Sequence, residues 1–456
     1  MRIVLLALIG SIPAIARPLS LLPENPHYFL FGGRPTVLVT SGEHYGAVLN
    51  ADFDYKKYLD TLRADRLNLT RTFSGSYREV PGNFKIASNT LAPAPGKFLA
   101  PWAQREGKFD LMKWDDAYFA RLKDFVSYAG RNGVVVELVL FCPLYEDSMW
   151  NVSPMNARNN VNGIGEVART EVLALKDARL TAVQDAMVRK IVSELQEFDN
   201  LYYEICNEPY FGGVTAAWQE HISKVIADTE AGSGKKHLIA QNWANGSKVV
   251  DAPNPLVGLF NFHYSRPPAS VGMNWKLGRA IGNNETGFDG GSDAVYRIQG
   301  WDFLMAGGAL YNNLDYSFAV GHEDGSFVPT ESTPGGGSAA LRRQLGILRA
   351  FFDDIPFWKM RAVEGAVRVL EAPGEVYAAY LHRGRVVKDG KPRYEVDEAV
   401  GAGEVRLRLG PGGYVAKWLD PRSGSYVKEE RVEGGAEVVL VSPAYREDLA
   451  LLVRRR

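Results

Sequence analysis

Two glutamates at the ends of predicted strands are the residues of this 456-residue sequence best placed to do chemistry. Glu208 stands in Asn207-Glu208-Pro209 directly after the apolar run 201–206, and Glu285 closely follows the run 279–283. If both runs belong to one parallel barrel, their carboxyl groups face each other across its mouth, and we expect a separation of about 5 Å. Such a pair suits cleavage of a glycosidic bond with retention. One carboxyl, with a raised pKa, protonates the leaving oxygen, and the other attacks the anomeric carbon.

Other polar and aromatic residues also follow predicted strands. Arg71 ends the run 67–72, where it is either part of the site or a structural ion-pair residue. Glu43 and His44 precede Tyr45 after the run 35–41, and this cluster either binds sugar hydroxyls or caps a loop. Trp243 follows another strand and is a candidate for stacking on a sugar ring.

The elements that position these residues repeat along the chain. Strand-like apolar runs alternate with helical patterns in the order expected of a (β/α)₈ barrel. An open doubly wound sheet is the main rival, but the first turn, 40–46, lacks its glycine fingerprint. The eight predicted strands are 35–41, 67–72, 134–141, 201–206, 237–241, 256–262, 279–283 and 308–311.

The pattern changes near residue 360. Helical periodicity gives way to alternating segments separated by turns rich in glycine and proline, which predicts a small antiparallel β-sandwich. We therefore expect a barrel over 17–360 and a β-sandwich over 361–456. The sandwich is expected to support the barrel and not to capture substrate, because no strand places three aromatics on one exposed face.

Composition and short motifs exclude several functions. Lysine plus arginine number 52 against 53 acidic residues, so no net field attracts nucleic acid or a membrane. No metal-ligand or cofactor motif is present, and Cys142 and Cys206 are either paired or buried thiols. The leading residues have the layout of a secretory signal, so we predict a signal peptide over 1–16 and a secreted or periplasmic protein.

The strand-ending Asn-Glu-Pro with a later strand-ending Glu resembles the retaining glycoside hydrolases of the (β/α)₈ clan, in particular the cellulase-like family 5, some followed by an accessory β-domain. The resemblance implies a carbohydrate substrate, no cofactor, Glu208 as acid/base and Glu285 as nucleophile. It further implies that Asn207 binds the substrate and that Arg71 keeps the nucleophile ionised. The resemblance adds three further site residues. His263 and Tyr264 correspond to the family's His-x-Tyr segment, although they are adjacent here. Asp315 lies in the stretch 311–316, which stands where the family has a tryptophan.

Two other readings remain open from the sequence. A carbohydrate-binding barrel without activity would not need both carboxylates. A lyase on the same barrel would need a base placed to abstract a sugar C5 proton, and no residue stands out for that role.

Overall fold

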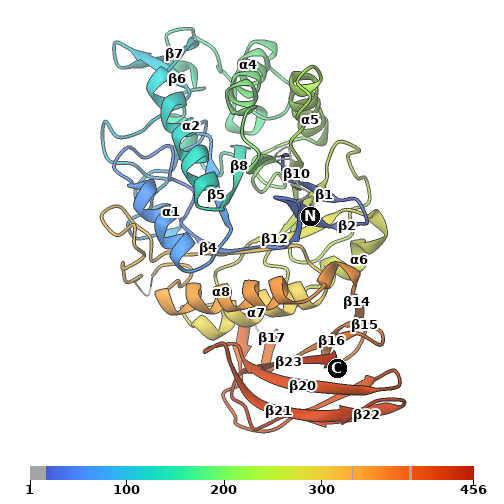
Figure 1. Ribbon diagram of the computed structural model, residues 1–456. Helices are drawn as coiled ribbons and strands as arrows, with labels where there is room; N and C mark the ends of the chain where they lie inside the picture. The colour runs from blue at the N-terminus through green and yellow to red at the C-terminus, as the bar shows by residue number, and fades with distance from the viewer. Residues whose placement is uncertain (1–16, 331, 390–392) are drawn as a thin grey trace, which may run out of the picture.

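The computed structural model describes residues 17–330, 332–389 and 393–456, and the predicted signal peptide, 1–16, lies outside these residues. An eight-stranded parallel sheet forms the larger part of the molecule (Figure 1). It confirms the predicted (β/α)₈ barrel. In hydrogen-bonding order its strands are β4 (Leu38–Gly42), β13 (Leu310–Leu314), β12 (Ala280–Glu285), β11 (Leu259–His263), β10 (Ile239–Asn245), β9 (Leu201–Cys206), β8 (Val135–Phe141) and β5 (Leu69–Phe73).

The first two barrel strands meet through a buried side chain and not through a continuous ladder. Asn68, just before β5, donates to the carbonyl of Val37 at 2.9 Å and accepts from the amide of Val39 at 2.8 Å. Further along, the amide of Phe73 donates to the carbonyl of Tyr45 at 3.0 Å. These bonds bring the ends of β4 and β5 together, so the residues that follow them share one mouth.

Helices cover the outside of the barrel, and most begin at a side-chain cap. Asp54, Asp115, Asp177 and Ser338 each accept from a backbone amide in the first turn of a helix, which satisfies donors that the helix itself cannot. The helices are α1 (Tyr55–Ala64), α2 (Asp116–Arg131), α3 (Asp147–Val152), α4 (Ala178–Leu195), α5 (Ala216–Glu230), α6 (Ala269–Asn274), α7 (Asp293–Met305) and α8 (Ala339–Asp354).

Short elements fill the connections and the N-terminal segment. The N-terminal strands β1 (Ser20–Leu22), β2 (Asn25–Phe31) and β3 (Arg34–Thr36) form their own antiparallel sheet. In the connection between β5 and α2, a hairpin pairs β6 (Trp102–Arg105) with β7 (Lys108–Trp114). Single 3₁₀ turns are η1 (Asn83–Lys85), η2 (Ala157–Asn159), η3 (Arg169–Glu171), η4 (Trp275–Leu277) and η5 (Phe357–Lys359).

Antiparallel sheets make up the C-terminal region, as predicted. A six-stranded sheet packs against a two-stranded one, and a core between them includes Leu407, Tyr414 and Trp418. The strands are β14 (Arg361–Val363), β15 (Arg368–Ala372), β16 (Val376–His382), β17 (Gly384–Val387), β18 (Arg393–Val396), β19 (Glu404–Arg408), β20 (Gly413–Asp420), β21 (Ser425–Glu433), β22 (Glu437–Val441) and β23 (Asp448–Arg455).

Helices α7 and α8 lie between the barrel and these sheets (Figure 1). On this boundary Trp301 of α7 stacks on Tyr380 of β16 with ring centroids 5.2 Å apart. No helix within the described residues is long and apolar enough to cross a membrane. The structure leaves Cys142 and Cys206 as free, buried thiols.

Candidate active site

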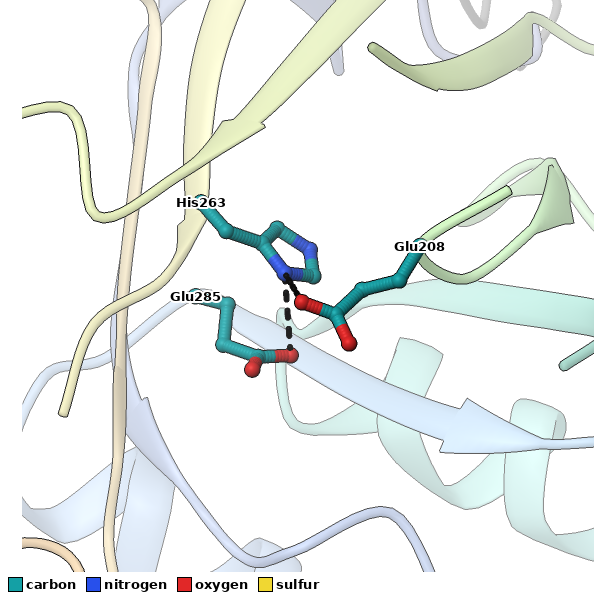
Figure 2. Close-up of side chains that lie close together, drawn as sticks. All are labelled: Glu208, His263 and Glu285. Carbon is teal, nitrogen blue, oxygen red and sulfur yellow. Dashed lines mark hydrogen bonds and ion pairs between the residues drawn. The ribbon is translucent and has the colours of Figure 1, made fainter. Parts of the chain in front are cut away.

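The carboxyl groups of Glu208 and Glu285 lie close together at the mouth of the barrel, on either side of His263 (Figure 2). Glu208 follows β9 by two residues, Glu285 ends β12, and His263 ends β11 between them. His263 Nδ1 lies 3.2 Å from Glu208 Oε1 and 3.5 Å from Glu285 Oε2. One oxygen of each carboxyl group lies within 4.8 Å of the other. Parallel packing of β9, β11 and β12 therefore brings three titratable groups to one point.

Glu285 is held by donors on several strands. The hydroxyl of Tyr45 donates to Oε2 at 2.9 Å, and Arg71 Nη1 donates to the same oxygen at 3.0 Å. The hydroxyl of Tyr264, just past β11, donates to Oε1. Both oxygens of Glu285 therefore accept hydrogen bonds, and these fix the position of the carboxyl group at the mouth of the barrel.

Arg71 is fully buried beneath this pair. Its guanidinium also contacts Glu204, Glu137 (3.3 Å from Nε) and Asn207 (2.8 Å from Nη2). Burial lowers the pKa of Arg71, but the neighbouring carboxylates of Glu204, Glu137 and Glu285 outweigh burial and raise it. Arg71 thus belongs to a structural ion-pair cluster and contacts the site as well. Glu204, within β9, is buried and pairs with Arg71.

Glu208 is bonded to a different set of groups. The hydroxyls of Tyr145 and Tyr210 donate to it at 2.6 Å and 3.2 Å. Burial raises the pKa of Glu208, but its hydrogen bond to His263, the charge of His263 and the Tyr145 hydroxyl outweigh burial and lower the pKa to about 2. This lowered pKa differs from the raised pKa that the sequence predicts for the acid.

A narrow cavity opens directly beside the two carboxyl groups. The centre of a water molecule reaches a volume of about 60 Å³ inside it. Of the predicted site residues, His44, Asn207 and Tyr264 line this cavity with the two glutamates. The other lining residues are Tyr45, Phe73, Glu79, Phe84, Ile86, Leu91, Cys142, Tyr145, Phe288 and Leu314.

Three predicted site residues point elsewhere. Glu43 accepts from the amides of Gly46 and Ala47 at 3.0 and 2.9 Å, so it fastens its own loop. Both oxygens of Asp315 are bonded to buried partners, including Arg342 of α8 at 3.0 Å. Trp243 donates its indole N–H to the carbonyl of Val249 and lines a separate surface hollow.

Sequence reasoning missed several residues that contact the pair or its cavity, among them Tyr145, Tyr210 and Glu79. Tyr145 and Tyr210 donate to Glu208, and Glu79 lines the cavity. Tyr210 stands two residues after Glu208, so its position offered a signal. Tyr145 and Glu79 lie in long connections after β8 and β5 and match no motif.

Glu208, His263 and Glu285 also offer three possible metal-ligand atoms within 4.8 Å, in the part of the chain that is described. Arg71 already places a positive charge 3.0 Å from Glu285 Oε2. A cation at the same oxygen would be repelled by this guanidinium, so the arrangement suits acid–base and nucleophilic chemistry better than metal binding.

Comparisons with known proteins agree with this geometry. Residues 91–276 match the family model described as cellulase (glycosyl hydrolase family 5). A protein of Bacteroides vulgatus ATCC 8482 superposes with a TM-score of 0.66 at 13% identity, covering 97% of this chain and 83% of that one. A glycoside hydrolase family 5 protein of the same organism gives 0.63 at 11% identity, covering 96% and 93%. No curated protein matches the sequence.

Proposed function

We propose, with the support of the family 5 match over residues 91–276 and of the barrel fold, that this chain is a glycoside hydrolase that cleaves β-glycosidic bonds of an oligosaccharide or polysaccharide with retention. The observation that carries this proposal is that one carboxylate oxygen of Glu208 lies within 4.8 Å of one carboxylate oxygen of Glu285. Retaining enzymes place the two groups about 5 to 5.5 Å apart, whereas inverting enzymes leave about 6.5 to 9.5 Å for a water molecule.

Glu285 is the nucleophile in this proposal. Its carboxylate oxygen attacks the anomeric carbon, the bond from that carbon to the leaving oxygen breaks, and Glu208 gives its proton to that oxygen. Glu208 then takes a proton from a water molecule, which attacks the anomeric carbon and releases Glu285. The proton and the carboxylate are both restored at the end of the cycle.

Glu208 must hold a proton in the first step, although its neighbours lower its pKa. A bound sugar excludes water from the cavity, and two carboxylates within 4.8 Å then favour sharing one proton. Glu285 already accepts from Arg71, Tyr45 and Tyr264, so in this proposal the shared proton goes to Glu208.

The stereochemistry of the first product tests this proposal. Aryl β-glycosides are hydrolysed by the purified protein while proton NMR follows the anomeric signals. The β-anomer should form first, and the Glu285→Gln variant should lose at least about 1000-fold in kcat. Glu106→Gln, an exposed glutamate on the β6–β7 turn, is the matched control and should keep full activity. An α-anomer as first product, or carbohydrate binding without turnover, would contradict the proposal.

Export is proposed from residues 1–16 alone. Expression of the full chain in a bacterial host, followed by fractionation, should give a protein outside the cytoplasm whose first residue lies near Arg17. An uncleaved cytoplasmic protein would show that this segment is not a signal peptide.

A further inference from the structure

The wall of the carboxylate cavity is a continuous chain of contacts that begins at Glu208. Tyr145 donates to Glu208 at 2.6 Å, and its ring meets the ring of Tyr77 edge-on with centroids 6.4 Å apart. The hydroxyl of Tyr77 in turn donates to Glu79 at 3.1 Å. Tyr145 and Glu79 line the cavity, and Tyr77 connects the two.

The second half runs from Glu79 back to the other carboxylate. Glu79 Oε1 lies 4.0 Å from His44 Nε2, and the imidazole of His44 stacks on Tyr45 with centroids 5.0 Å apart. Tyr45 donates to Glu285 at 2.9 Å, which completes the chain. Glu79 and His44 therefore lie in the middle of this chain of contacts, separated from Glu208 and Glu285 by tyrosine rings.

His44 has unused hydrogen-bonding capacity at this position. Its side chain is only 13% exposed, and no described residue gives either ring nitrogen a hydrogen bond. Tyr45 and Tyr316 hold the ring between them, with centroids 5.0 and 5.6 Å away. Buried polar atoms normally have partners, so a fixed ring without one beside a cavity is suited to bind ligand hydroxyls.

The cavity is also small. Phe84, Ile86 and Leu91, all from the connection after β5, line it as well. Its volume of about 60 Å³ holds a handful of water molecules at about 10–15 Å³ each, which is the scale of one sugar ring and not of a chain.

The mouth of the cavity is aromatic on the side of Glu208. Phe84 and Phe211 both pack on Tyr145, at 5.4 and 5.8 Å between centroids, and both are half-exposed. A leaving group that departs over Glu208 would pass these rings.

We propose that the enzyme is exo-acting and binds a single terminal sugar ring in this cavity. Glu79 and His44 bind the hydroxyls farthest from the anomeric carbon and block any further sugar on that side, while the rest of the substrate lies over Phe84 and Phe211. This inference rests on the proposed function and adds the mode of cleavage to it.

The cleavage pattern tests the inference. The probes are 4-nitrophenyl β-glycosides of single sugars and of the matching disaccharides, with carboxymethylcellulose and glucomannan as polymers. Single-sugar glycosides should release nitrophenol at once, and disaccharide glycosides should lose one sugar before nitrophenol appears. Release of an intact disaccharide, or a rapid fall in polymer viscosity, would overturn exo action and leave glycoside hydrolysis standing. No turnover of any probe would overturn both proposals.

Deoxy analogues of the sugar that reacts test the role of Glu79. In the wild type, removing the hydroxyl that Glu79 binds should lower kcat/KM about tenfold or more, because a buried hydrogen bond to a charged group is lost. In Glu79→Gln the same removal should cost much less, whereas Glu106→Gln should behave as the wild type. Equal losses in Glu79→Gln and the wild type for every deoxy position would show that Glu79 only supports the wall.

Discussion

In the proposed mechanism, Glu208 acts as an acid in the first step and as a base in the second. As a base it benefits from the hydroxyl of Tyr145 and from His263, which stabilise the carboxylate. As an acid it must carry a proton, which these same contacts disfavour. The balance between the two forms is therefore set by side chains around Glu208 and can be shifted by changing one of them.

Tyr145→Phe removes one of these donors and keeps the ring. The pKa of Glu208 should rise, because burial still raises it while one lowering contact is gone. In the proposed mechanism, bond cleavage requires protonated Glu208 in the enzyme–substrate complex. The basic limb of the kcat profile should therefore move to higher pH, by about one pH unit for a hydrogen bond worth about 1.4 kcal/mol. Profiles measured on a glycoside with a poor leaving group, whose departure needs the proton of Glu208, check this.

Tyr426→Phe, an exposed tyrosine in the C-terminal region, is the control and should leave the profile unchanged. A Tyr145→Phe profile with the same basic limb would mean that the Tyr145 hydroxyl does not set the protonation of Glu208.

Residue types at strand ends were enough to predict that Glu208 and Glu285 lie close together, but not which side chains surround them. Asn207, Glu208 and Glu285 could be predicted because parallel strands of one barrel end at the same mouth. Tyr145 lies four residues past its strand in an irregular connection. No periodicity or motif fixes where such a side chain points, so its contact with Glu208 needed the structure.

At the scale of elements, a polar side chain that follows a strand either contacts the substrate or bonds to another part of the protein. Asp315 follows β13 but turns to Arg342 of α8, and so fastens a helix to the barrel. Glu43 follows β4 and fastens the turn 43–47. The sequence alone could not separate these anchors from substrate contacts, because both stand at the expected distance from a strand.

Glu43 makes the stability of its loop depend on pH. Burial raises its pKa to about 7, although Thr90 and two backbone amides lower it. The folded state therefore favours the protonated form, so the stabilising contribution is complete below about pH 4.5 and is lost as the pH rises through about 7. The difference between these values corresponds to about 3 kcal/mol.

Glu43→Gln removes this titration. The variant should be less stable than the wild type at pH 5, because it loses an acceptor for the loop amides, and the gap should shrink by about 3 kcal/mol toward pH 8. Thermal and denaturant unfolding at a series of pH values measures the gap. A gap that is constant with pH, as expected for the exposed control Glu106→Gln, would show that Glu43 does not titrate in this range.

Helix α7 differs from an ordinary surface helix of a barrel. Every residue from Ala294 to Met305 is buried, so the helix lacks the alternation of apolar and polar residues that marks a surface helix. It is buried on both sides, because the barrel covers one side and the C-terminal sheets cover the other (Figure 1). A search for amphipathic helices would therefore miss α7.

For the whole molecule, the contact between barrel and C-terminal sheets resembles a domain core. Arg297 of α7 is 1% exposed and pairs with Asp448 of β23 at 2.7 Å, and Tyr380 donates to the same carboxylate at 2.7 Å. Trp301 is fully buried against Tyr380. A buried ion pair of this kind leaves an uncompensated charge when one partner is removed.

Deleting residues 361–456 should therefore give an insoluble or strongly destabilised barrel, since it exposes Trp301 and leaves Arg297 without Asp448 and Glu447. Because such a truncation can fail to fold for several reasons, Asp448→Ala in the full chain isolates the ion pair. It should lower the free energy of unfolding by about 3–5 kcal/mol with little change in KM, whereas the exposed Asp397→Ala should have almost no effect. Denaturant unfolding and kinetics on aryl glycosides measure the two quantities. A soluble truncation that keeps full activity on small glycosides but no longer binds an insoluble polysaccharide would show that the C-terminal sheets capture substrate, because support of the barrel would then be unnecessary.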